Sequence, residues 1–383
     1  MSQLTQSIPD ADALLDQYAL PEQIRQNARV GLVELVAALR EEPLNATGLA
    51  KAVATIHEDL SRLQAILDDR ARFPEIASVE IKQPMFILGL PRCGTSALHA
   101  LIGADPQVRT PLQWEVNAPS PPPGAPGQDT AKRVADYDAY LRGRFGPAYD
   151  DMQKAHPFGP MIPQECGSFM TTSFQSSNPC MSYRLPRFYD WFQGIDATFR
   201  YEIHKMWLQH LGWRTGRTHW VLKIQEHMYK MPALRSVYPD AVFVQPHRDP
   251  TTVIASVSQL ILTLRSPGYD GQDGRALGQE MLHLWHDGSV CLMAHRAEHP
   301  DLPIHDIRYK ELIADPVATI GDIYRRFGWD FTPQSADAVL GWLRDNPAGK
   351  HGKHRYDLDD FGLTVDDIRD VYADYIEAYR DYI

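Results

Sequence analysis

The stretch FILGLPRCGTSALHALI, residues 86–102, decides the fold of this chain. The apolar run at 85–89 predicts a short buried strand, and the apolar spacing of Leu98 and Ile102 predicts a helix. A glycine-bearing loop at 89–96 joins the two. This order of strand, loop and helix directs successive backbone N–H groups and the positive end of a helix at one point. The stretch therefore predicts an anion site, with a tight turn that binds nothing as the alternative.

The same loop departs from the Walker A pattern of nucleoside triphosphate binding. Gly89 and Gly94 satisfy the glycine spacing of that pattern, but Thr95 stands where the pattern requires lysine. The missing lysine is the group that reaches the outer phosphates of a nucleoside triphosphate. Here the cation is Arg92, within the loop, and Ser96 follows as a second hydroxyl. The loop is therefore predicted to hold a nucleotide with a different terminal group.

A second segment, AVFVQPHRDPTTVIASVSQLI at 241–261, repeats the order of strand, loop and helix. Asp249 is the predicted N-cap and Pro250 the first helical residue. Because helical side chains lean toward the N-terminus, the Ser256 hydroxyl is expected to point back toward Arg248. These two residues are predicted to bind the same anion. Taken without the first loop, Arg248 is equally well explained as an arginine paired with an acid.

Short apolar runs separated by helical segments predict a parallel sheet covered on both faces by helices, a three-layer α/β fold of the P-loop kind. The four predicted strands are 85–89, 220–223, 241–245 and 303–309. The predicted amphipathic helices outside this core are 21–43, 46–69 and a final one at 364–382. The chain is therefore divided into a helical N-terminal extension at 1–80 and an α/β domain at 81–383, the latter with a proline-rich, irregular insertion at 104–218.

The composition excludes several classes of function. A formal net charge of −11 and a pI near 5.7 argue against the broad basic surface that nucleic-acid binding needs. No run of about eighteen apolar residues occurs, so no membrane span is expected. Four sparse cysteines and an acidic N-terminus predict a protein of the cytoplasm. The N-terminal helices are predicted as a packing element, with formation of a homodimer as the alternative.

Four segments of the chain resemble the PAPS-dependent sulfotransferases, where PAPS is 3′-phosphoadenosine 5′-phosphosulfate. The likeness is closest to the bacterial branch related to the tyrosylprotein sulfotransferases. The segments are LPRCGTSALHALIGADP at 90–106, HRDPTTVIASVSQL at 247–260, IRYKELIADP at 307–316 and GKHRYDLDDFGLT at 352–364. Two phosphate motifs in the correct order make a chance match improbable.

The resemblance implies a donor site with a contact for each end of PAPS. The 5′-phosphosulfate would be held by the loop residues Arg92, Cys93, Gly94, Thr95 and Ser96. The 3′-phosphate would be held by Arg248 and Ser256, and the adenine contacted by Tyr309. A local basic cluster, Lys350, Lys353 and Arg355, resembles the C-terminal loop that closes on the 3′-phosphate in this family. A solvated basic loop is the alternative for that cluster.

Moving a sulfuryl group to an alcohol or phenol needs a base for the proton of the nucleophile and cations for the developing charge. Glu115 resembles the catalytic glutamate of the tyrosylprotein sulfotransferases and is the first candidate base, although a glutamate paired with an arginine is the alternative. Lys223, at the end of a predicted strand, and Arg92 resemble the cations that stabilise developing charge. His227, four residues after Lys223, is the rival base.

The acceptor and the rival functions stay open at this stage. Aromatic residues are frequent in the insertion at 104–218, which predicts either an apolar cavity for a small hydrophobic alcohol or phenol, or simply a core. The pairs His351 with His354 and His204 with His210 lack convincing ligand spacing, so no metal is predicted. A P-loop nucleotide kinase and a non-catalytic nucleotide-binding protein are the alternative functions.

Overall fold

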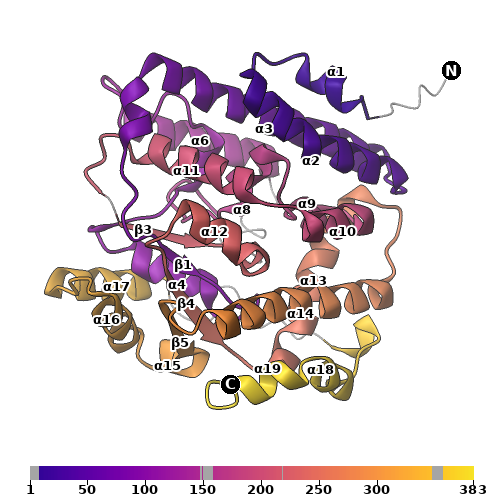
Figure 1. Ribbon diagram of the computed structural model, residues 1–383, viewed down its shortest axis with the longest axis vertical. Helices are drawn as coiled ribbons and strands as arrows, with labels where there is room; N and C mark the ends of the chain where they lie inside the picture. Colours follow the sequence, from indigo (N-terminus) through magenta and orange to yellow (C-terminus); the bar gives the residue numbers. More distant parts are fainter. Residues whose placement is uncertain (1–7, 147–148, 150–157, 218, 347–356) are drawn as a thin grey trace.

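A computed structural model describes residues 8–146, 149, 158–217, 219–346 and 357–383 of the chain. Its centre is a five-stranded sheet with the order β2-β3-β1-β4-β5, in which every neighbouring pair is parallel (Figure 1). The strands are β1 Met85–Ile87, β2 Val108–Arg109, β3 His219–Lys223, β4 Val242–His247 and β5 Ile304–Arg308. The four predicted strands are confirmed, and the two-residue β2 is additional because so short a strand shows no pattern in the sequence.

Successive residues of β1 enter two different cores, which makes the molecule three-layered. Met85 and Ile87 pack with the first group of helices, on one face of the sheet. Phe86 and Leu88 pack with the second group, on the opposite face. The first group is α4 Thr95–Gly103, α15 Tyr309–Ala314, α16 Pro316–Phe327 and α17 Pro333–Asp345, and the second includes α11 Thr198–Gly212 and α12 Met231–Val237. The predicted fold class is thereby confirmed.

The N-terminal helices are an outer layer of the second core. They are α1 Ala11–Leu15, α2 Glu22–Glu41 and α3 Ala46–Arg72, followed by the 3₁₀ helix η1 Pro74–Ser78. Figure 1 shows α2 and α3 side by side on the outside of α11. Leu32 of α2 and Leu60 of α3 are fully buried in the same cluster as Phe86 of the sheet. The apolar faces of α2 and α3 therefore pack against the rest of the same chain. These two helices correspond to the amphipathic helices predicted at 21–43 and 46–69.

The insertion is more regular than its prolines suggest. Besides β2 it contains α5 Gln113–Asn117, α6 Thr130–Phe145, α8 Gly167–Met170, η3 Thr171–Ser173, α9 Pro179–Ser182, α10 Pro186–Gly194 and α11. Prolines at the first turn of α9 and α10 start these helices rather than break them. Its aromatic side chains are mostly core residues, and the buried ones include Trp114, Phe169, Phe174, Tyr183, Phe188 and Phe192. Of the two readings of these rings, the structure supports core packing.

The remaining elements follow β3 in the chain. These elements are η4 Gln225–Lys230, η5 Pro250–Thr252, α13 Ile254–Arg265, η6 Ser266–Gly268, α14 Gly274–Glu298, η7 Asp359–Phe361, α18 Val365–Val371 and α19 Ala373–Ala378. Apolar residues of α13, α14, α18 and α19 form a core of their own. The single helix predicted at 364–382 is two helices, because the backbone leaves the helical region at Tyr372, with φ −97° and ψ 17°. Within the part of the chain that the structure describes, no helix combines the length and apolar character needed to cross a bilayer.

Candidate active site

Four parallel strands end at one edge of the sheet, where they lead into the candidate site. Ile87, the last residue of β1, is in register with Lys223, the last residue of β3. β4 ends at His247, directly before Arg248, and β5 ends directly before Tyr309. Since all the strands are parallel, these carboxyl ends lie together, where ligands bind in open α/β sheets.

The loop between β1 and α4 has the conformation of an anion cradle. Arg92 and Gly94 both have positive φ values, 64° and 84°, and Gly94 is the N-cap of the nine-residue helix α4. A Cβ atom at Gly94 would lie 2.9 Å from ring atom Cδ2 of Tyr309, so the ring can approach the loop only because this residue is glycine. The loop therefore presents its backbone and the start of α4 beside an aromatic face.

The two predicted phosphate sites meet in one place. Arg248 donates from Nη1 to the carbonyl oxygen of Arg92 over 3.1 Å, and its guanidinium carbon lies 4.5 Å from the ring centroid of Tyr309. Arg92 donates from Nε to Oγ of Ser256 over 3.1 Å. The sequence predicts that Ser256 points toward Arg248, and the contact described for its hydroxyl is with Arg92, to which Arg248 is itself bonded. Ser256 lies in the first turn of α13, which begins at Ile254 after the separate turn η5.

The remaining loop residues differ in what they offer a ligand. The Cys93 side chain is fully buried among apolar neighbours, and burial raises the pKa of its thiol to about 12, so only the backbone of Cys93 faces the site. Thr95 is buried, and its Oγ1 accepts from Nε2 of Gln225 over 3.3 Å. Ser96 is exposed. Among the predicted loop residues, Arg92 and Ser96 are therefore the side chains open to a ligand.

Lys223 joins the loop to an acid that sequence reasoning missed. Its Nζ donates to Oγ of Ser96 over 3.1 Å and to Oε1 of Glu165 over 2.5 Å. The Lys223 side chain is only 4% exposed, whereas that of Glu165 is 37% exposed. The cation is therefore enclosed beside the loop, while the carboxylate remains reachable from solvent.

Backbone pairing holds Glu165 at this position. The N–H of Cys166 donates to the carbonyl oxygen of Lys223 over 3.0 Å, and the N–H of Gln164 donates to that of Pro111 over 2.7 Å. Leu112 and Pro163 form an isolated antiparallel bridge. Glu165 lies in the stretch PQEC with no helical or strand pattern around it, so no local signal marks it in the sequence.

Glu115, the first candidate base, is buried in an ion pair. Its Oε1 accepts from Nη2 of Arg109 over 2.7 Å, and both side chains are about 5% exposed. Its Oε2 accepts from the backbone N–H of Leu112, which caps α5. Both carboxylate oxygens are thus engaged, as in the alternative of a glutamate fixed by an arginine. The contacts described for Glu115 do not include Lys223 or the loop.

His227 does not face the loop either. It is fully buried in η4, its Nδ1 lies 3.0 Å from the hydroxyl of Tyr201, and its ring packs edge-on against Phe86. Burial lowers the pKa of His227 well below its usual value. A base must reach the acceptor hydroxyl, and His227 is enclosed by the core. The predicted basic cluster, Lys350, Lys353 and Arg355, and the histidine pair His351 and His354 lie outside the described residues.

A parallel sheet with a glycine-bearing loop at its carboxyl edge, Arg92 within that loop and a buried lysine beside it are the features of an α/β group transferase. The chain belongs to the sulfotransferase family, whose sequence model matches residues 84–333. This match covers the sheet, the loop and both predicted phosphate segments.

Known relatives agree with that assignment. The omega-hydroxy-beta-dihydromenaquinone-9 sulfotransferases Stf3 of Mycobacterium tuberculosis and Mycobacterium bovis are 26% identical over 264 residues, which is 64% of this chain and 62% of each relative. The crystal structure of sulfotransferase STF1 from Mycobacterium tuberculosis matches 96% of this chain and 100% of its own with a TM-score of 0.82 and 26% identity. Sulfotransferase STF9 from Mycobacterium avium shares the fold, with a TM-score of 0.84, 21% identity and 98% of each chain covered.

Proposed function

We propose that this chain transfers the sulfuryl group of PAPS to the hydroxyl of a small, hydrophobic alcohol or phenol by in-line displacement. The observation that carries the proposal is the contact between the two phosphate segments, in which Arg248 bonds the backbone of Arg92 and stacks on Tyr309. A nucleotide with phosphate at one end and phosphosulfate at the other needs two anion contacts and a place for its base within one site. Arg92, Arg248 and Tyr309 supply this set.

In the proposed donor complex, the backbone of the loop, the start of α4 and the side chain of Arg92 hold the 5′-phosphosulfate. Arg248 and Ser256 hold the 3′-phosphate, and Tyr309 contacts the adenine. Arg92 lies between the two anion contacts, since its carbonyl oxygen binds Arg248 and its guanidinium binds Ser256. The donor site that we propose includes no metal, because the cations that the reaction needs are side chains.

The proposed base is Glu165. It removes the proton of the acceptor hydroxyl while the acceptor oxygen forms a bond to sulfur. The bond between sulfur and the bridging oxygen breaks, and adenosine 3′,5′-bisphosphate leaves with the electron pair of that bond. Lys223 stabilises the negative charge that grows on the bridging oxygen. Ser96 orients the Lys223 ammonium group, with which it already forms a hydrogen bond.

The nature of the acceptor is supported by the relatives rather than by a cavity. The Stf3 proteins are named for an omega-hydroxylated menaquinone, which is an alcohol on an apolar molecule. The chain spans 62% of the length of these relatives, so their acceptor is a guide to the chemical class alone. All four cysteines are free, which suits the cytoplasmic location that we also propose.

Thermal denaturation with candidate nucleotides tests the proposed donor. Adenosine 3′,5′-bisphosphate at about 100 times its Kd, without magnesium, should raise the Tm by about 3 °C, because a ligand of the native state stabilises it by mass action. ATP with magnesium at the same concentration should change the Tm far less, since the loop lacks the Walker lysine. A larger shift with ATP and magnesium would favour the nucleotide kinase instead.

A further inference from the structure

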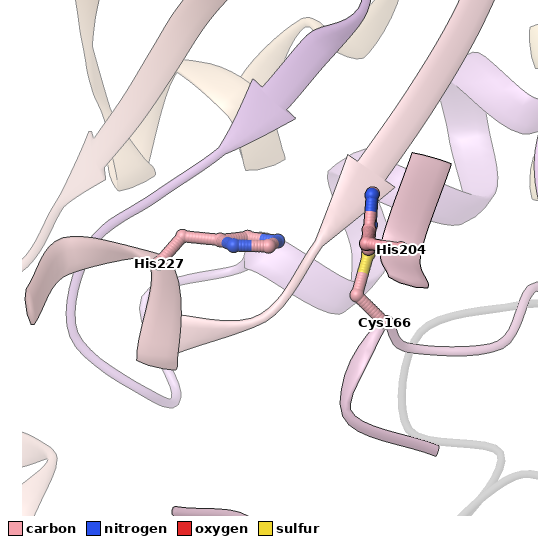
Figure 2. Close-up of side chains that lie close together, drawn as sticks. All are labelled: Cys166, His204 and His227. Carbon is pink, nitrogen blue, oxygen red and sulfur yellow. The ribbon is translucent and has the colours of Figure 1, made fainter. Parts of the chain in front are cut away.

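Three side chains from distant segments form a cluster in the second core that the proposed transfer does not use. Cys166, His204 and His227 place their thiol and imidazole donor atoms within 4.8 Å of one another. All three residues are fully buried. Figure 2 shows the imidazole of His227 directed toward Cys166 and His204. Their separation in the sequence explains why no ligand spacing was visible there.

Both imidazoles have one nitrogen held and one nitrogen unpaired. Nδ1 of His204 lies 2.7 Å from the hydroxyl of Tyr238, and Nδ1 of His227 lies 3.0 Å from the hydroxyl of Tyr201. In the part of the chain that the structure describes, Nε2 of each ring is buried without a hydrogen-bond partner. A buried nitrogen left unpaired is unfavourable, whichever tautomer the ring adopts.

This pattern is the one that metal-binding histidines show. When Nδ1 donates its proton to a tyrosine oxygen, Nε2 carries the lone pair that a metal ion accepts. The thiol of Cys166, which is free, becomes a thiolate on binding a thiophilic ion. The donors of one ion lie roughly 3.3 to 3.7 Å apart when the bonds are about 2.0 to 2.3 Å long, so the rings close by about 1 Å on binding.

We propose that Cys166, His204 and His227 bind one closed-shell thiophilic metal ion, with Cu(I) preferred to Zn(II). The preference follows from charge. Cu(I) with one thiolate and two neutral imidazoles is an uncharged unit, whereas Zn(II) leaves a net positive charge in the core. The surroundings are apolar rings, since Phe86 packs against His227 and Phe169 against His204.

A bound ion would stabilise the candidate active site at the carboxyl edge of the sheet without contacting the substrates. Cys166 directly follows Glu165 and donates its backbone N–H to Lys223, while His227 lies in the turn that follows Lys223. The ion therefore ties the segment that carries the proposed base to the end of β3 and to α11. Because the site is closed to solvent, we expect loading during folding rather than by exchange into the native protein.

The test measures metal content and stability without donor or acceptor, so its outcome is independent of the proposed function. The full chain is refolded from denaturant under anaerobic, reducing conditions with Cu(I) or Zn(II), desalted and analysed by elemental mass spectrometry. We expect one Cu(I) per chain, a Tm clearly higher than that of the metal-free protein, and an X-ray absorption shell of one sulfur and two nitrogens.

Cys166→Ser should abolish stoichiometric copper binding, whereas the matched variant Cys180→Ser, which removes another fully buried free thiol, should retain it. Circular dichroism of both variants verifies that each is folded, and the absorption spectrum of the unmodified chain provides evidence that does not depend on any variant. Absence of stoichiometric metal, or equal copper content in Cys166→Ser, would overturn the site. Zn(II) retained in preference to Cu(I) would overturn the choice of ion.

Discussion

Replacement of Glu165 by glutamine should lower the turnover number by about 10² to 10⁴, while the affinity for adenosine 3′,5′-bisphosphate stays near that of the unmodified chain. The glutamine has nearly the shape of glutamate and keeps an oxygen that accepts from Lys223, but it does not take the proton of the acceptor. Initial rates with labelled PAPS and a panel of hydrophobic alcohols and phenols give the turnover number, and calorimetry gives the affinity.

Glu115→Gln separates the two candidate bases. This variant should cost about 3 to 5 kcal/mol of stability, because it leaves the charge of buried Arg109 without its partner, yet turnover per folded molecule should fall only a few-fold. His227→Gln tests the histidine in the same assay. Should Glu165→Gln remain active while Glu115→Gln loses turnover and stays folded, the base is Glu115 and the position of Glu165 is structural.

Acidification should destabilise the metal-free protein strongly, because several histidines are buried in the neutral form. Burial lowers the pKa of His99 and of His210 to about 4 and that of His204 to about 3, and it also lowers the pKa of His227 well below its usual value. The unfolded chain therefore binds more protons than the folded chain between pH 6.5 and pH 4. The stabilisation is present above about pH 6.5, and each histidine removes about 2 kcal/mol of it between pH 7 and pH 5.

Two buried aspartates act against this destabilisation by acid. Burial raises the pKa values of Asp59 and Asp69, which makes the folded chain the better proton acceptor at those two sites. Urea unfolding at pH 7, 6 and 5 with a chelator present measures the net slope. His99→Gln should reduce the slope of unfolding free energy against pH by about one proton, because glutamine does not titrate. Its amide can still donate to the carbonyl of Val221, so the fold is retained. The same substitution at the exposed His283 is the matched control. A free energy of unfolding that is flat or higher at pH 5 would contradict the prediction.

The features predicted correctly from the sequence are local ones. The strand, loop and helix at 85–102 are encoded within one continuous stretch, in which Gly94 permits the positive φ that the turn needs. The apolar periods of α2 and α3 likewise lie within each helix. Short-range patterns of this kind report directly on the backbone and on which side chains face a core.

The features that were missed depend on contacts between distant segments. Glu165 reaches Lys223 only because residues 160–166 pair with residues 111–114 and with the end of β3. The contact between Ser256 and Arg92 joins residues that are 164 positions apart in the chain. The cluster of Cys166, His204 and His227 is likewise created by tertiary packing.

Above all, we propose that Arg92 and Arg248 serve opposite ends of one adenosine nucleotide that carries an anionic group at each end. Calorimetric titration without magnesium of the unmodified chain, Arg92→Ala and Arg248→Ala tests it, with two ligands that differ in the 3′-phosphate. Adenosine 3′,5′-bisphosphate should bind with one molecule per chain, and either substitution should weaken it about 10- to 150-fold, as expected for the loss of charge-assisted hydrogen bonds worth about 1.5 to 3 kcal/mol.

Adenosine 5′-phosphosulfate, which lacks the 3′-phosphate, tests whether Arg248 contacts that phosphate. We predict that Arg92→Ala weakens its binding and that Arg248→Ala leaves its Kd within about 3-fold of that of the unmodified chain, a change of under about 1 kcal/mol. Equal weakening of both ligands by Arg248→Ala, or no effect of either substitution on the bisphosphate, would contradict it.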